Sequence, residues 1–377
     1  MVNYIKGMAE DFEDIIAFGN YVFNLDFKEL LPKLYSEKVD TSFNHFMAKE
    51  NNEIKGVVGS FPLELKVMNE TLKVKGIGTV SVHPQSRDKG YMMQLMKNAI
   101  NEMKEESIDF AILGGQRQRY EYFGFTPTGS QIIFEVNNAN LYHKKIRVND
   151  NISLKSFEDI SEDESNSIYT LYNQQIVYGV RSLESFADIC KSWNNNAWGI
   201  YNEGIIIGYI VLSKTHDNVE EVCLEDYGVL GNVFASIINM FHKDRLYVGI
   251  APHRQQLITY LLDICENYKV ESNTCVNIFN YKNFIKAFLT LKNSYEVLEK
   301  GELKIEIVDG EKFIIKVGDN ITVEATEYLP DIKIAHLDAI KFLCDPLRIF
   351  SNDIPEINRC IKSWFPLPFN FPTVDNV

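Results

Sequence analysis

The chain has 377 residues, of which 45% are hydrophobic and 24% are charged. This composition is typical of globular proteins and excludes a disordered, collagen-like or low-complexity chain. The 52 acidic residues outnumber the 38 basic ones, which gives a formal net charge of −14. Because duplex binding depends largely on neutralising phosphates, we expect no nucleic-acid partner, and the acidic balance favours cationic substrates.

The six cysteines are scattered along the chain and form no C-x-x-C pair. This pattern indicates reduced, mostly buried thiols and neither a disulfide framework nor a zinc site, so we expect no metal. The chain does not open with a basic segment followed by an apolar stretch, and it contains no run of about 18 apolar residues that could span a membrane. We therefore expect a cytoplasmic protein without a membrane partner.

Strands and helices are predicted to alternate in the first third of the chain. Strands are expected over residues 3–6, 45–49, 54–68, 71–82 and 109–113, and helices over 10–23 and 90–106. Asn51–Asn52, between two of the strands, is typical of a hairpin turn. In the second helix Met92, Leu95 and Met96 begin an apolar series at spacings of three and four, which predicts one buried face.

Polar residues over 137–151 indicate a domain boundary, and the order strand, hairpin, strand, helix, strand then recurs. The elements expected there are strands over 198–201, 205–212, 219–227 and 246–250 and a helix over 229–241. From residue 296 the pattern alternates as strands do, with a hairpin signal at Asp309–Gly310. The aromatic, proline-rich end over 364–372 cannot form a regular helix, and we expect it to dock on the body of the protein.

A candidate anion site lies where the strand over 71–82 meets the helix over 90–106. The short turn between them places free backbone N–H groups at the positive end of a helix. Gly90 lets a ligand approach the backbone closely, and Arg87 and Lys89 add positive charge. These features are the ones that a diphosphate site requires.

This segment resembles the GNAT acetyltransferases, whose Arg/Gln-x-x-Gly-x-Gly/Ala signature surrounds the pyrophosphate of coenzyme A. The match here is Arg87-x-x-Gly90-x-Met92. Together with residues 113–125, which contain the pattern Tyr-x-x-x-Gly-Phe, it resembles one branch, the enhanced-intracellular-survival (Eis) type. That branch tolerates a large residue where Met92 stands.

The resemblance implies an α+β fold, with two tandem GNAT-like domains and a C-terminal α+β domain that is similar to sterol carrier proteins. The expected boundaries are 1–140 for the active GNAT domain, 150–293 for a degenerate copy, and 294–377 for the third domain with its tail. In the second segment the strand runs into Gly228 without an Arg/Gln-x-x-Gly turn or a basic residue. We therefore expect only the first domain to bind a cofactor.

The resemblance also implies the cosubstrate, acetyl-coenzyme A, and the site residues. Val80 and Val82 would offer backbone hydrogen bonds to the pantetheine arm. The pyrophosphate would be surrounded by Arg87, Asp88, Lys89, Gly90, Tyr91 and Met92. Tyr120 would be the general acid that protonates the leaving thiolate, and the carboxylate of Val377 would accept the proton of the amine.

Other interpretations of these residues stay open at this point. Tyr120 could serve packing alone, and the tail could simply cover apolar surface. His83 is expected to be a packing residue at the end of a strand, and Asp26 is a further candidate carboxylate for the amine.

The predicted function is direct acetyl transfer, in a ternary complex, to a primary amine of a cationic acceptor, either a small molecule or a lysine side chain. The alternative is a non-catalytic protein that senses acetyl-coenzyme A or binds an apolar ligand. The branch resemblance also suggests a homo-oligomer, with a hexamer as the expected assembly.

Overall fold

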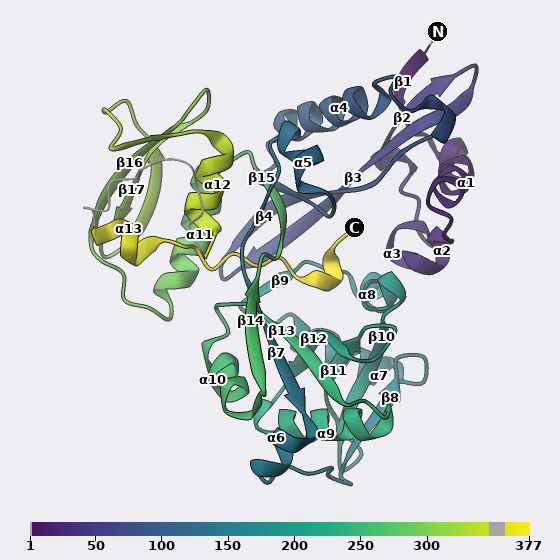
Figure 1. Cartoon of the computed structure of the whole chain (residues 1–377), viewed down its shortest axis with the longest axis vertical. Helices are drawn as coiled ribbons and strands as arrows, with labels where there is room; N and C mark the ends of the chain where they lie inside the picture. The colour runs from purple at the N-terminus through teal and green to yellow at the C-terminus, as the bar shows by residue number, and fades with distance from the viewer. Residues whose placement is uncertain (1, 347–358) are drawn as a thin grey trace.

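The computed structural model describes residues 2–346 and 359–377, and these residues form three β-sheets with helices packed on them (Figure 1). We call them sheets A, B and C, in the order in which the chain enters them. In Figure 1 sheet A lies at the upper right, sheet B at the bottom and sheet C at the left.

Sheet A carries the N-terminal strands. Its strands are β1 (Val2–Lys6), β2 (His45–Glu50), β3 (Glu53–Val67), β4 (Glu70–Val82), β5 (Phe110–Leu113), β6 (Thr126–Thr128), β9 (Val177–Gly179) and β15 (Thr274–Ile278). They lie in the order β1-β2-β3-β4-β5-β15-β6, with β9 paired to β3. The accompanying helices are α1 (Phe12–Phe23), α2 (Phe27–Leu30), α3 (Pro32–Tyr35), α4 (Tyr91–Glu105) and α5 (Arg117–Tyr120). Val58 of β3 packs in the cluster under α4 and its neighbour Val57 in the cluster under α1, so these helices cover opposite faces.

Sheet B forms the second region. Its strands are β7 (Gln131–Asn137), β8 (Ile152–Ser156), β10 (Asn196–Asn202), β11 (Ile205–Leu212), β12 (Asn218–Leu224), β13 (Arg245–Ile250) and β14 (Asn267–Glu271). They lie in the order β14-β7-β13-β12-β11-β10-β8. The accompanying helices are α6 (Asn138–His143), α7 (Glu162–Tyr172), α8 (Leu183–Lys191), α9 (Leu230–Met240) and α10 (Gln255–Ile264).

Sheet C is the smallest sheet and forms the third region. Its strands β16 (Gly301–Ile307), β17 (Lys312–Val317), β18 (Ile321–Ala325) and β19 (Ile332–Ile334) lie in the order β18-β17-β16-β19. The helices beside it are α11 (Tyr281–Asn293), α12 (His336–Cys344) and α13 (Arg359–Trp364).

The first two regions exchange strands. β7 follows sheet A in the chain but lies in sheet B between β13 and β14, and β15 follows sheet B but lies in sheet A between β5 and β6. The segment expected over 1–140 therefore contains one strand of sheet B, β7, and the segment expected over 150–293 contains two strands of sheet A, β9 and β15. This exchange joins the two regions through backbone hydrogen bonds.

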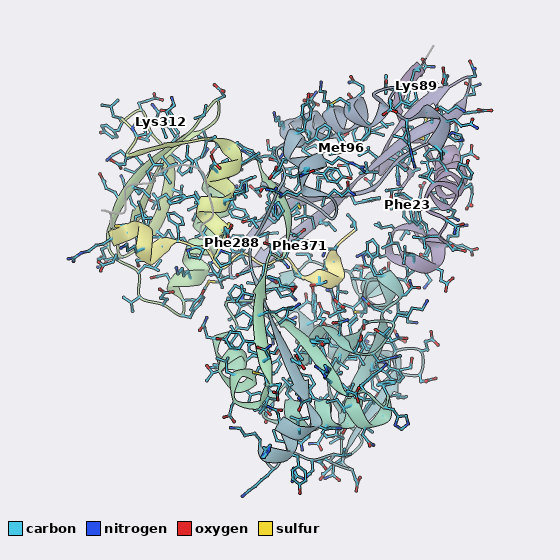
Figure 2. The ribbon with its side chains drawn as sticks, in the orientation of Figure 1. Phe23, Lys89, Met96, Phe288, Lys312 and Phe371 are labelled. Carbon is cyan, nitrogen blue, oxygen red and sulfur yellow. The ribbon has the colours of Figure 1, made fainter. Side chains whose placement is uncertain are left out.

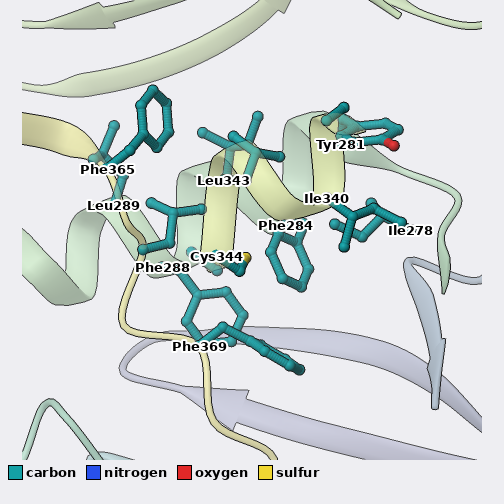
Figure 3. Close-up of a cluster of buried hydrophobic side chains, with 14 of the residues drawn as sticks. Ile278, Tyr281, Phe284, Phe288, Leu289, Ile340, Leu343, Cys344, Phe365 and Phe369 are labelled. Carbon is teal, nitrogen blue, oxygen red and sulfur yellow. The ribbon is translucent and has the colours of Figure 1, made fainter. Parts of the chain in front are cut away.

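One apolar core joins sheets A and C. It contains residues of β3, β4 and β5, the inner face of α11, the strands of sheet C, and α12. Figure 3 shows how Phe284 and Phe288 of α11, Leu343 of α12 and Phe369 of the tail gather in this core. The third region is therefore packed firmly on the first.

The C-terminal tail crosses the middle of the molecule and ends near α3, away from the sheet C region where it starts (Figure 1). Phe365, Leu367, Phe369 and Phe371 are at most 1% exposed, and each buried Phe stabilises this path by about 2 kcal/mol. Phe371 and Phe288 both belong to this core, and both are labelled near the middle of the view in Figure 2. The predicted docking of the tail is confirmed.

Most predicted elements are confirmed within one or two residues. The strand over 71–82 is β4 and the helix over 90–106 is α4, whose Leu95, Met96 and Ala99 are fully buried, as the spacing predicts. The strand predicted over 219–227 is too long, since β12 ends at Leu224. Its end has a local cause, because the Asp226 carboxylate accepts a hydrogen bond from Gly228 N and begins a 3-10 turn.

Within residues 2–346 and 359–377, no helix is long and apolar enough to cross a membrane. The same residues contain no group of three or more His, Cys, Asp or Glu side chains placed to hold a metal ion. Five of the six cysteines are buried, as the sequence predicts for most of them, and Cys265 is partly exposed.

Candidate active site

β4 and β5 run parallel and part before β4 ends. Their pairing extends as far as Ile77 and Leu113, whereas β4 continues to Val82. In the described part of sheet A, the last residues of β4, including Val80 and Val82, therefore have no partner strand on the β5 side. A free strand edge offers backbone N–H and C=O groups to an extended ligand.

A β-bulge lies at the start of this free edge. The register of β4 against β3 shifts after Gly78, and Thr79 has a φ of 53°. This left-handed conformation is rare for a β-branched residue and stores strain. A bulge of this kind redirects the backbone groups that follow it, here those of Val80 and Val82.

A buried chain of hydrogen bonds holds Thr79 in place. Its Oγ1 lies 2.5 Å from Tyr35 Oη, which lies 3.0 Å from His45 Nε2, and His45 Nδ1 lies 2.8 Å from Thr41 O. Burial lowers the pKa of His45 to about 4, so the ring is neutral near pH 7. Nδ1–H then donates to Thr41 O, Nε2 accepts from Tyr35, and Tyr35 accepts from Thr79.

The turn after β4 leads to an open helix N-terminus. Gly90 has a φ of 78°, and a Cβ at this position would meet no atom within 4 Å. The N-terminus of α4 has no side-chain cap, so its first amides are available to an anion. The preceding residues Arg87, Asp88 and Lys89 are exposed; Lys89 lies 3.4 Å from the Glu50 carboxylate.

Tyr91 and Met92, which the resemblance places around the pyrophosphate, begin α4. Tyr91 is buried and donates to the Glu50 carboxylate at 3.3 Å, whereas the partly buried Met92 packs on the apolar cluster below the helix. Their backbone amides stand in the first turn, while their side chains serve packing. His83, before the turn, accepts from Gln85 N and stacks on Tyr21, which agrees with the packing role expected for it.

Tyr120 ends α5, just beyond the point where β5 turns away. It is 6% exposed, and a Cβ at Gly115 would lie only 2.6 Å from its ring, so the ring packs directly on the backbone after β5. Burial raises the pKa of Tyr120, and the phenol therefore stays protonated near neutral pH. Such a group can donate a proton to a developing negative charge.

The last residue of the chain lies against β4, on the face opposite α4. Val377 packs with Tyr35 and Phe61, its side chain contacts Gly76, and a Cβ at Gly78 would lie 3.3 Å from its carboxyl carbon. The C-terminal carboxylate therefore lies beside β4 at the residue before the bulge.

The fold thus brings Val377 to β4 beside its free edge, although the two are far apart in sequence, and the Gly90 turn follows that edge along the chain. Asp26 does not join them, because its carboxylate accepts from Lys28 N and Glu29 N and caps α2. The sequence analysis missed the Thr79–Tyr35–His45 chain. Single polar residues on separate elements have no spacing pattern that could have revealed it.

Comparisons with known proteins agree with this geometry. Residues 3–128 match the family described as acetyltransferase (GNAT) domain. No curated protein is significantly similar to the chain in sequence.

Several solved structures share this fold over 91% to 100% of the chain. The GCN5-related N-acetyltransferase from Kribbella flavida has a TM-score of 0.71 at 11% identity, covering 100% of this chain and 98% of that one. The GCN5-related N-acetyltransferase from Anabaena variabilis has a TM-score of 0.66 at 14% identity, covering 91% and 89%. Eis1 from Mycobacterium abscessus has a TM-score of 0.63 at 12% identity, covering 100% of both chains. Residues 3–128 therefore match a GNAT acetyltransferase domain, and the chain has a mixed α/β, GNAT-like fold.

Proposed function

We propose that the chain is an acetyl-coenzyme A-dependent N-acetyltransferase of the enhanced-intracellular-survival type, with one working site. The observation that carries the proposal is the position of Val377, whose carboxyl carbon lies beside β4 at Gly78, next to the free strand edge. This arrangement supports acetyl transfer in a ternary complex, because a carboxylate and a cosubstrate edge share one short stretch of strand.

The residues present fit acetyl-coenzyme A. The open space at Gly90 and the uncapped amides of α4 suit a pyrophosphate, with Arg87 and Lys89 to balance its charge. The free edge at Val80 and Val82 suits the pantetheine arm. When bound, acetyl-coenzyme A supplies a thioester carbonyl and a thiol leaving group.

Two groups of the chain handle the protons. The Val377 carboxylate holds the ammonium of the acceptor and takes one proton from it, so that the neutral amine can form the C–N bond with the thioester carbonyl carbon. As the C–S bond breaks, the Tyr120 phenol, whose pKa burial raises further, gives its proton to sulfur, and the second proton that the nitrogen loses restores the phenol. Orientation of the amine on the sheet supplies much of the remaining acceleration.

The acceptor is a primary amine on a cationic molecule or a lysine side chain. A carboxylate at the site and a net charge of −14 both favour a cation. The proposal includes the three domains expected from the sequence, with sheet C as the core of the sterol-carrier-protein-like domain. It also includes a cytoplasmic homo-oligomer, a hexamer by resemblance.

A thiol-release assay against a panel of polyamines, aminoglycosides and lysine peptides tests the proposal. We expect turnover with at least one cationic amine. A matched variant with two glycines added after Val377 displaces the carboxylate by up to about 7 Å, and we expect its turnover to fall roughly 100-fold while acetyl-coenzyme A affinity holds.

Two outcomes contradict the proposal in different ways. Tight acetyl-coenzyme A binding without turnover of any amine favours the non-catalytic sensor instead. Normal turnover of the extended variant removes the carboxylate from the mechanism and leaves Tyr120 as its acid.

A further inference from the structure

The residues just before Val377 are held by a buried arginine that lies outside the GNAT signature. Arg181 follows β9 and its side chain is 0% exposed. Its Nε and Nη2 donate to the two carboxylate oxygens of Asp375 at 2.8 and 2.9 Å. Its Nη1 and Nη2 also donate to Glu221 of β12, at 2.9 and 2.7 Å. Two bidentate carboxylates fix the guanidinium in one orientation.

Two further side chains hold the residues on either side of Asp375. Lys33 of α3 donates to Val374 O at 2.9 Å and also to Asn376 O. Trp193 Nε1 donates to Asn376 O at 3.0 Å. Trp193 has a φ of 64°, a strained conformation for so large a residue that persists only where its surroundings impose it.

These contacts fix the position of the terminal carboxylate. We call the contacts of Arg181, Lys33 and Trp193 with residues 374–376 the clamp. Asp375 stands two residues before Val377, so the clamp lies within about 7 Å of the terminus along the chain. A Cβ at Gly179 would lie 2.5 Å from the Asp375 carboxylate, so the tail also lies tightly against β9. Little freedom is left for the last two residues, which lead directly to Gly78.

Stability alone is a poor explanation for the clamp. The apolar run from Phe365 to Phe371 already attaches the tail by burying aromatic rings. A buried ion triad is often no more stabilising than well-packed apolar residues of the same volume, whereas the bidentate contacts seen here hold Asp375 in one orientation. The contacts around Arg181 therefore favour a role in positioning the end of the chain.

We propose that Arg181 is a positioning residue, and that the sheet B region serves the active site as the anchor of the C-terminal carboxylate. The proposal rests on the proposed function for its catalytic meaning. It gives the second region a role although that region is expected to bind no cofactor.

The test compares Asp375→Asn with the matched control Glu135→Gln. Both changes convert a carboxylate that binds an arginine into an amide, but Glu135 pairs with Arg245 on sheet B and does not contact the tail. Asp375→Asn leaves Arg181 paired with Glu221, so we expect the variant to fold. Trp193→Phe is a second, milder variant that removes the indole N–H donor to Asn376 O and keeps a smaller aromatic ring.

Two readouts separate the clamp from the proposed function. The first is the rate at which carboxypeptidase releases Val377 from the native protein, normalised to synthetic peptides of residues 370–377 with the same changes. The second is the division of the effect between kcat and the KM for acetyl-coenzyme A. We expect Asp375→Asn to release Val377 faster and to lower kcat roughly 10- to 100-fold, with KM within about twofold and Trp193→Phe showing a smaller change of the same kind.

If Asp375→Asn releases Val377 no faster than the wild-type protein, the proposal is overturned. It is also overturned if the variant releases Val377 faster but its kcat is unchanged. If the wild-type protein turns over no amine at all, the proposed function fails, and the release rates alone still decide whether Arg181 anchors the tail.

Discussion

Sheets A and B each contain a pair of parallel strands that part, with a helix that begins where the first strand of the pair ends. In sheet A these elements are β4, β5 and α4; in sheet B they are β12, β13 and α9. β12 and β13 pair only at two positions, Asn218 with Tyr247 and Val219 with Val248. The backbone plan of the two regions is therefore similar.

The turns that lead into the two helices differ in charge, although neither α4 nor α9 has a side-chain cap of its own. α4 begins at an uncapped Gly90 beside Arg87 and Lys89. α9 follows a 3-10 turn in which the Asp226 carboxylate already accepts from Gly228 N at 2.8 Å. A cavity of about 870 Å³ opens near this second turn, and its lining includes four acidic residues, Glu220, Glu221, Glu225 and Asp226, beside one arginine, Arg254.

The Asp226 carboxylate accepts from the turn that leads into α9, and negative charge there disfavours a phosphate. We therefore expect a few residues at the turn to decide which of the two regions can hold a diphosphate. This difference teaches that the fold alone does not make the site.

If only the parting strands of sheet A form an active site, the largest effect on turnover is expected from changing its general acid, Tyr120. Tyr120→Phe removes the proton donor and keeps the ring, and we expect kcat to fall about 100-fold or more with little change in acetyl-coenzyme A affinity. Tyr122→Phe is the matched control, because Tyr122 is 66% exposed two residues away. Equal activity of the two variants in steady-state kinetics would remove Tyr120 from the mechanism.

The buried chain behind the β4 bulge predicts a pH effect on stability. Burial lowers the pKa of His45 from 6.5 to about 4, so between these values the unfolded chain binds a proton that the native state excludes. Stability is then lost as pH falls from 6.5 to 4, by about 3 kcal/mol for this group. Urea unfolding of wild type and His45→Gln across this range checks it, and parallel pH curves would contradict it.

A substitution at Gly90, in the turn before α4, is expected to have a smaller effect. Gly90→Val places a β-branched residue at a φ of 78°, and its side chain enters the open space above the turn. We expect acetyl-coenzyme A affinity to fall by about 10- to 100-fold, since the left-handed conformation alone costs about 1–2 kcal/mol. Gly228→Ala at the matching turn of sheet B is expected to leave affinity unchanged. Calorimetry that finds normal affinity in a folded Gly90→Val protein would place the site elsewhere.

Local patterns predicted much of the sheet A region. The alternation of β4 and the three-and-four spacing of α4 are local signals, and the charged turn between them carries the family signature. The docking of the tail was also predictable. Its proline residues exclude a regular helix over 364–372, and its phenylalanine residues favour burial against the body of the protein.

Long-range pairing could not be predicted in the same way. The exchange of β7 and β15 depends on contacts between segments more than 100 residues apart, and no local pattern specifies them. Arg181, Lys33 and Trp193 are single residues on separate elements whose shared target, the chain end, becomes visible only in three dimensions.

The central claim is that the parting strands of sheet A bind acetyl-coenzyme A and those of sheet B do not. Calorimetric titration of the whole chain tests this claim most directly. The account predicts one acetyl-coenzyme A bound per chain, with binding weakened by Gly90→Val and unaffected by Gly228→Ala. A stoichiometry of two, or a single site that responds to Gly228→Ala and not to Gly90→Val, would contradict it.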